Sequence, residues 1–241
     1  MYSIGKAIST ATNFVKRQKR NYRIAITRTA LSEFLAKLTY QYDSIYTMAL
    51  GANTVQLGFI MSIGNGVSSL ISTPVGWLVD QYGLKKFWLL GIGLMAGAVL
   101  VYAVAPNWKA IIAAMILWWV SKRLMGTGCS VICADSLPNK DRSTGKNLCN
   151  TLSSVLSLIA PLVGAFLITE FGGMSVEGIR PLYYIRLIGY SFIFLFVAAQ
   201  LREPERIKMS ERKVKLGFLG DFKQLFEQST DLKKCFAVSC L

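Results

Sequence analysis

The chain has 241 residues, of which 53% are hydrophobic and only 17% charged, so it has too few polar residues to cover a soluble domain of this size. It contains no histidine, which removes the commonest general base and metal ligand, and its five cysteines lack metal-ligand spacing. We therefore expect no enzymatic activity, no metal and no cofactor. The net charge of +14 would suggest nucleic-acid binding in a soluble protein, but the basic residues cluster between apolar runs. That clustering favours a membrane-topology signal and no nucleic-acid partner.

Six apolar runs follow one another along the chain, and each is long enough to cross about 30 Å of hydrocarbon as a helix. They cover approximately Ile24–Leu50, Asn53–Val79, Phe87–Ala105, Trp108–Ala134, Asn147–Thr169 and Tyr183–Leu201. Several contain glycine or proline, which membrane helices tolerate better than soluble ones. The predicted fold is all-α, with a six-helix bundle embedded in the lipid bilayer over residues 24–201.

Lysine and arginine counts set the predicted orientation of the bundle. Residues 1–23 are basic, as are the connections after the second, fourth and sixth runs, whereas the other connections have only Arg180, with Lys109 nearby. Because basic loops stay in the cytoplasm, we expect a multi-pass plasma-membrane protein with both termini cytoplasmic. Because a basic start is followed by a long, charge-bearing first run, we expect no cleavable signal peptide.

The end of the chain has a different composition from the bundle. Residues 202–234 are predicted to form a cytoplasmic loop, with an amphipathic helix at 216–227 lying on the membrane surface. Residues 235–241 begin a new apolar run that is too short to cross a bilayer. We interpret this run as the start of a truncated seventh helix.

A glycine- and lysine-containing connection joins the second and third runs, at residues 76–86 (GWLVDQYGLKK). It resembles the signature loop of the major facilitator superfamily, and it departs from the usual pattern at Val79, Gln81 and Leu84. The positions that carry the resemblance are Gly76, Leu78, Asp80, Gly83, Lys85 and Lys86.

Three weaker similarities point to the same family. The connection after the fourth run, with Asp135 and Arg142, resembles the family's loop between spans four and five. In the fourth run Lys122 occupies the slot of the family's arginine, and Arg123 is displaced by one position. Pro161 and Gly164 are the matches to the family's antiporter motif in the fifth span, so the resemblance only weakly implies antiport.

The resemblance implies the amino-terminal half of a twelve-span transporter, built from two three-helix inverted repeats. A small solute would bind at the membrane midplane between the two halves and cross by alternating access, with an ion, expected to be H⁺, as the coupling partner. Two alternatives stay open. One is a truncated protein without transport activity, and the other is a six-helix subunit that needs a separate carboxy-terminal half or a homodimer partner. A membrane enzyme is the least favoured reading.

Charged and polar side chains lie inside two of the apolar runs. At about 100° per residue, Glu33, Lys37, Tyr40 and Ser44 share one stripe of the first run, with Asp43 at its flank. The stripe predicts a helix that faces a cavity or the bundle interior. Lys122 and Arg123 lie near the centre of the fourth run, the other run expected to line that cavity.

An ionised group at mid-membrane needs a partner, and Glu33 has three candidates, namely Lys37, Lys122 and Arg123. These charges either serve substrate binding and coupling or neutralise one another and fix helix packing. Asp43 is expected nearer the outside with no cation at its depth, which makes it the candidate proton-coupling carboxylate.

Overall fold

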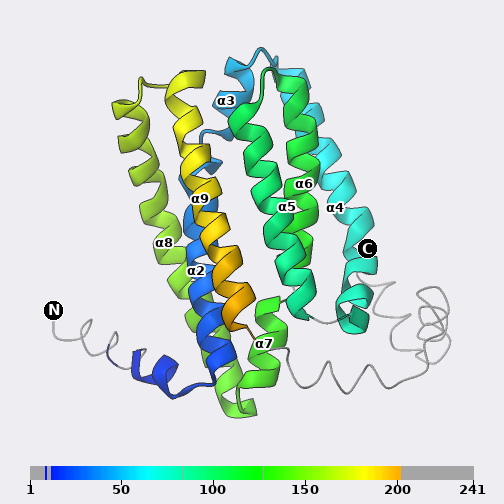
Figure 1. The fold of residues 1–241 in the computed structure, drawn as a ribbon, viewed down its shortest axis with the longest axis vertical. Helices are drawn as coiled ribbons and strands as arrows, with labels where there is room; N and C mark the ends of the chain where they lie inside the picture. The colour runs from blue at the N-terminus through cyan, green and yellow to red at the C-terminus, as the bar shows by residue number, and fades with distance from the viewer. Residues whose placement is uncertain (1–8, 10–11, 83, 127, 202–241) are drawn as a thin grey trace, which may run out of the picture.

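The computed structural model describes residue 9 and residues 12–82, 84–126 and 128–201, with side chains at all of these except 73, 76–82, 128–130 and 135. This part of the chain is helical apart from short turns (Figure 1). The predicted surface helix at 216–227 and the predicted start of a seventh helix at 235–241 lie outside the described residues.

Among the described residues, eight helices account for the six predicted runs, because the first run and the fourth run each contain two helices. The helices are α2 (Arg20–Tyr40), α3 (Asp43–Ala49), α4 (Thr54–Tyr82), α5 (Leu84–Val104), α6 (Trp108–Gly126), α7 (Gly128–Ser136), α8 (Arg142–Glu170) and α9 (Val176–Gln200), with a short 3₁₀ turn η1 (Asn139–Asp141) before α8. Within the described residues, five stretches are long and apolar enough to cross a membrane: Thr54–Ser72, Leu84–Val104, Trp108–Ala134, Asn139–Glu170 and Val176–Gln200.

The first run differs from its prediction in two ways. It is not among the five apolar stretches, because α2 carries the charges of Arg28, Glu33 and Lys37. It is also divided in two, since α2 ends at Tyr40 and α3 begins at Asp43. The Tyr42 amide donates to the carbonyl of Thr39 at 2.7 Å, a tighter three-residue turn that replaces one α-helical hydrogen bond.

The sixth run begins earlier than predicted. The run was predicted to begin at Tyr183, with Pro181 in the connection before it, but α9 starts at Val176 and contains that proline. Ser175 caps the helix, because its hydroxyl oxygen accepts the Gly178 amide at 3.1 Å. Pro181 lies in the second turn, after the Ile179 amide has already bonded to the Ser175 carbonyl at 3.1 Å, so it removes one hydrogen bond of the helix. Membrane helices tolerate such a proline better than soluble ones.

The helices form two groups that meet along α5 and α9. α2 packs against α8 and α9, α6 packs against α4 and α5, and α5 packs against α9 (Figure 1). α2 and α6 thus face each other as the inner members of the two groups. The end of the bundle where α2 and α8 begin and α9 ends also holds the basic side chains of Arg20, Lys85 and Lys146.

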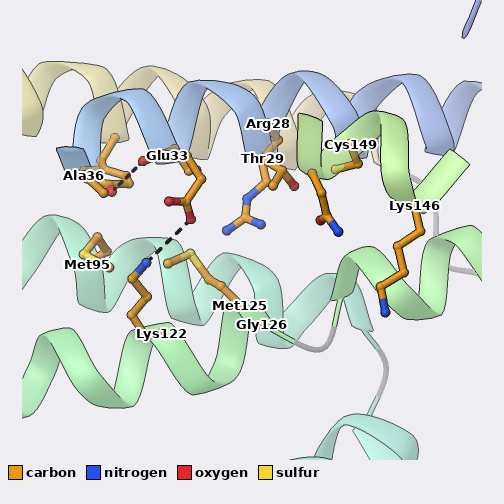
Figure 2. A pocket seen from close by; sticks show the side chains of 13 residues that line it. Arg28, Thr29, Glu33, Ala36, Met95, Lys122, Met125, Gly126, Lys146 and Cys149 are labelled. Atoms are coloured by element: carbon orange, nitrogen blue, oxygen red, sulfur yellow. Dashed lines mark hydrogen bonds and ion pairs between the residues drawn. The ribbon is translucent and has the colours of Figure 1, made fainter. Parts of the chain in front are cut away.

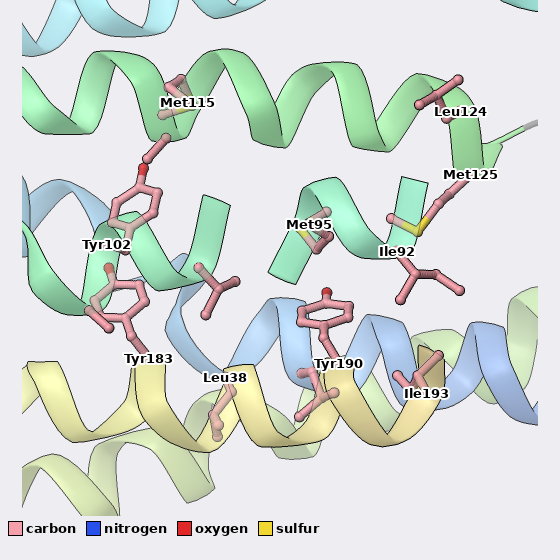
Figure 3. Close-up of a cluster of buried hydrophobic side chains, with 14 of the residues drawn as sticks. Leu38, Ile92, Met95, Tyr102, Met115, Leu124, Met125, Tyr183, Tyr190 and Ile193 are labelled. Atoms are coloured by element: carbon pink, nitrogen blue, oxygen red, sulfur yellow. The ribbon is translucent and has the colours of Figure 1, made fainter. Parts of the chain in front are cut away.

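Aromatic rings fill the middle of the bundle. Tyr102 of α5 and Tyr183 of α9 stack with ring centroids 5.0 Å apart, and Tyr190 of α9 points toward Met95 of α5 (Figure 3). All four side chains are buried. Burying rings of this size supplies much of the packing between the two groups of helices.

Candidate functional site

Three cavities run along the side of α2 and α3 that faces α6. Their volumes are about 400, 390 and 260 Å³. The first and second share Ala36 and Lys122, and the second and third share Tyr40, Trp118 and Trp119. Because neighbouring cavities share walls, we treat them as one feature, called the groove, with an inner, a middle and an outer part.

The inner part of the groove holds the ion pair that joins α2 to α6. Lys122 Nζ lies 3.6 Å from Glu33 Oε1, and the two side chains are 34% and 32% exposed. Figure 2 shows Arg28, Thr29 and Glu33 of α2 on one side of this cavity and Lys122 on the other, with Lys146 entering from α8. Of the three pairings left open for Glu33, the structure contains the one with Lys122.

Arg28 is a groove residue that sequence reasoning missed. It is 4% exposed, and its guanidinium lies 4.6 Å from the ring centroid of Trp88. The Trp88 indole is fixed in turn, because its Nε1–H donates to the Met125 carbonyl at 3.3 Å. Arg28 falls outside the helical stripe that contains Glu33, and it reaches the cavity through its long side chain.

The middle part of the groove is lined by aromatic and basic residues. Lys37 Nζ lies 4.1 Å from the ring centroid of Tyr40, a cation–π contact rather than an ion pair. Arg123 Nε donates to Ser68 Oγ of α4 at 2.6 Å, so this cation is directed away from Glu33. Lys37 and Arg123 therefore line the groove without forming the pairings with Glu33 that the sequence allowed.

The outer part of the groove contains Asp43 and Ser44 of α3. The Tyr183 hydroxyl donates to Asp43 Oδ1 at 2.7 Å. Arg186 of α9 lines the same cavity with only 2% of its surface exposed, and its Nη1 donates to Thr39 Oγ1. The prediction that Asp43 has no cation at its depth is therefore wrong. The sequence did contain an indication of this cation, because Arg186 is the single arginine in the apolar sixth run.

The signature positions lie at one end of the bundle. Gly76, Leu78 and Asp80 belong to the last two turns of α4, which extends past the predicted end at Val79, and Gly83 lies outside the described residues. Lys85 Nζ donates to the Ala198 carbonyl near the end of α9 at 2.9 Å, whereas Lys86 is exposed. In this chain Lys85 therefore links the start of α5 to the end of α9.

Arg142, from the loop predicted to resemble the family's connection between spans four and five, stabilises the end of α7. Its Nη2 donates to the Ala134 carbonyl at 2.7 Å and its Nε to the Leu137 carbonyl at 3.3 Å. A cation that donates to the last carbonyls of a helix also complements the helix dipole. The side chain of Asp135 lies outside the described residues.

Pro161 and Gly164 of α8 lie against α2 rather than in the groove. The Tyr42 hydroxyl donates to the Pro161 carbonyl at 3.0 Å. A Cβ atom added to Gly164 would meet the Leu38 carbonyl oxygen at 2.5 Å. These residues allow the two helix backbones to approach closely, as small residues do in membrane bundles.

The fold and the groove define a polytopic helical membrane protein with a charged internal site. Residues 25–240 match the family model described as Major Facilitator Superfamily, so the chain belongs to that superfamily. No curated protein sequence matches the chain.

Three solved structures illustrate the shared fold. The human organic anion transporter MFSD10 (TETRAN) is 18% identical with a TM-score of 0.62, and the match covers 83% of this chain and 51% of that one. A peptide transporter POT in complex with sulfate is 16% identical with a TM-score of 0.61, covering 89% and 45%. A POT family transporter in complex with a thioalcohol conjugated peptide is 15% identical with a TM-score of 0.60, covering 89% and 46%. The chain thus spans about half the length of the structures it matches.

Proposed function

We propose that the chain forms the amino-terminal half of a secondary active transporter that moves a small solute across the membrane by alternating access. The observation that carries this proposal is the groove, in which Glu33 and Lys122 pair between two inner helices of a membrane bundle. Ionisable groups at such positions mark solute or ion pathways. The proposal is supported by the family and by the solved relatives, whose names describe transporters of organic anions and peptides.

In this proposal α2 and α3 together form the first of six spans. They run from Arg20 to Ala49 with one tight turn between them. Their charges do not argue against spanning, because α2 packs on α8 and α9 and turns its polar side to the groove. The basic residues at the end of the bundle that contains the start of α2 would face the cytoplasm of a plasma-membrane protein, with both termini on that side. The six spans would comprise two inverted three-helix repeats.

Asp43 is the proposed proton-coupling carboxylate. It faces the outer cavity together with Arg186, and Thr39, Tyr102 and Tyr183 are its other polar neighbours. Protonating Asp43 would remove the charge that balances Arg186 and would weaken the link between α3 and α9. A rearrangement of helices could follow from that change, which is what coupling requires.

The second half of the transport pathway would come from a carboxy-terminal six-helix bundle or from a second copy of the chain. Exposing Glu33 and Lys122 to lipid would be costly, so we expect a single bundle to be inactive. A six-helix membrane subunit without transport activity of its own is the alternative function.

Reconstitution into liposomes tests the proposal. The chain is incorporated as a monomer or as a cross-linked dimer, a proton gradient is imposed, and uptake is screened over charged and neutral solutes. We expect uptake by the dimer or by a chain completed with a carboxy-terminal half, and its loss in Asp43→Asn. Gradient-driven uptake by a proven monomer would overturn the two-bundle mechanism.

A further inference from the structure

The inner and middle parts of the groove define a class of solute. We propose that the groove binds an organic anion, with its acidic group between Arg28, Lys122 and Lys146 and its apolar body against Tyr40 and Trp118. This inference rests on the proposed function, because it assigns a charge to the solute that the transporter would carry.

The first argument is the balance of charge. The inner cavity is lined by the three cations of the proposed site and by one carboxylate, Glu33. Along the whole groove the cations are Arg28, Lys37, Lys122, Arg123, Lys146 and Arg186, and the carboxylates are Glu33 and Asp43. Six cations against two carboxylates leave an excess of four positive charges. Excess charge of one sign is costly in a groove between apolar helices, and an anionic occupant would offset it.

The second argument is the set of polar atoms in the groove wall that lack partners. Among the described residues, the hydroxyls of Thr29 and Ser32, two residues that line the inner cavity, have no hydrogen-bond partner. A hydroxyl can donate a hydrogen bond as well as accept one. Buried hydroxyls without partners cost free energy, so this wall favours a ligand whose oxygens can form hydrogen bonds with them.

The third argument is the neighbouring aromatic surface. The rings of Trp118 and Trp119 meet edge to face with centroids 5.0 Å apart, and both line the middle cavity beside Tyr40. This cavity adjoins the inner one at Lys122. A basic pocket next to an aromatic pocket fits a solute with one acidic group and one apolar part, and both cavities have the size of small-molecule sites.

Binding to the purified 241-residue chain in neutral detergent tests the inference. The probes are cyclohexanecarboxylate, cyclohexylmethanol and cyclohexylmethylammonium, which share a ring and differ in charge. Calorimetric titration at low ionic strength gives the three affinities. We expect the carboxylate to bind about tenfold more tightly than the alcohol, and the ammonium to bind more weakly than either.

Two variants that change the charge of the inner cavity in opposite directions test the location of the site. Lys146→Gln removes a cation from the inner cavity and should weaken carboxylate binding several-fold, while Glu33→Gln removes the carboxylate there and should strengthen it. Neither change should alter binding of the alcohol. Lys140→Gln is the matched control, because Lys140 is exposed on η1 and lines none of the three cavities.

The outcomes separate this inference from the proposed function. Equal affinity for the three probes, or preference for the ammonium, would overturn the anionic class while leaving a solute site in the groove. An anion preference that Lys146→Gln and Lys140→Gln reduce equally would overturn the assigned location. If no probe binds, the inference fails, and the liposome experiment still decides whether the protein transports another solute.

Discussion

The two sides of α2 differ in how they meet the rest of the bundle. On one side α2 lies against α8 and α9, where the Tyr190 hydroxyl donates to the Ser32 carbonyl at 3.3 Å and the Gly164 backbone approaches Leu38. On the other side α2 faces α6 across the groove, where Lys122 reaches Glu33 at 3.6 Å and both side chains remain partly exposed. One helix therefore combines a packed side with a partly open, charged side.

The difference separates stability from function along a single helix. On the packed side, α2 contacts α8 and α9 through backbone atoms and buried rings, so a small change in side-chain volume or charge forces neighbouring atoms to move. On the groove side, long side chains bridge a cavity, so a change alters charge more than packing. Substitutions on the packed side should therefore cost folding free energy, whereas those on the groove side should mainly affect ligand binding.

Arg186 provides the largest expected effect, because it is buried between the packed side of α2 and the outer cavity. Arg186→Met removes the donor to Thr39 and leaves Asp43 without its neighbouring cation. Losing a buried hydrogen bond and the cation beside a partly buried carboxylate costs about 3 kcal/mol. We expect Arg186→Met to lower the free energy of unfolding by this amount, as measured by thermal or denaturant unfolding in detergent.

A double variant and a control variant test whether the lost stability comes from the charge of Arg186. Asp43→Asn combined with Arg186→Met removes both charges and should recover part of the lost stability. Lys109→Met is the control for loss of a cation, because Lys109 is exposed, and it should change stability by less than about 0.5 kcal/mol. If Arg186→Met has the same free energy of unfolding as the control, then Arg186 at the outer part of the groove does not contribute to the stability of the bundle.

Gly164 should show an intermediate effect. In Gly164→Ala the new methyl group would lie 2.5 Å from the Leu38 carbonyl oxygen and 3.0 Å from the Tyr42 ring, so α8 must move away from α2. Such overpacking costs about 1–3 kcal/mol. The matched control is Gly97→Ala in α5, where an added Cβ meets no described atom within 4 Å. Because alanine is the better helix former, the control should be neutral or slightly more stable.

The measurement is the difference in unfolding free energy between these two glycine variants. A loss confined to Gly164→Ala supports the close approach of α2 and α8. Equal stability of the two variants would show that the packed side accommodates a methyl group and is less tightly packed than the structure indicates.

Sequence alone predicted the parts of the fold that depend on local composition. Long apolar runs located α4 to α9 to within a few residues at most ends, because about 20 apolar residues are needed to cross the bilayer. The pairing of Glu33 with Lys122 was among the predicted alternatives, since charges inside two runs must find partners. The late start assigned to the sixth run was wrong, because Pro181 was interpreted as part of a loop.

The rest depends on how the helices rotate and pack, which no local pattern specifies. The position of Arg186 beside Asp43 requires α9 to turn one particular face to α3. Arg28 enters the groove because Trp88 of α5 supports its guanidinium. Both arginines were visible in the sequence, but their partners lie far away along the chain. The charged side of α2 was therefore predictable, whereas much of what surrounds it was not.

The smallest expected effect concerns the ion pair on the groove side, and it directly tests the comparison between the two sides of α2. Glu33 and Lys122 are each about one-third exposed, so solvent screens their attraction, and exposed pairs contribute about 0.2–1 kcal/mol. A double-mutant cycle with Glu33→Gln, Lys122→Gln and both together isolates the coupling energy. Unfolding in detergent should give a coupling within that range, and added salt should reduce it because the pair is accessible to ions.

Neither single variant should lose as much stability as Arg186→Met, since the other charge of the pair can still be hydrated in the groove. A coupling of about 3 kcal/mol or more, insensitive to salt, would instead identify a closed and desolvated pair, and the side of α2 that faces α6 would then belong to the packed framework.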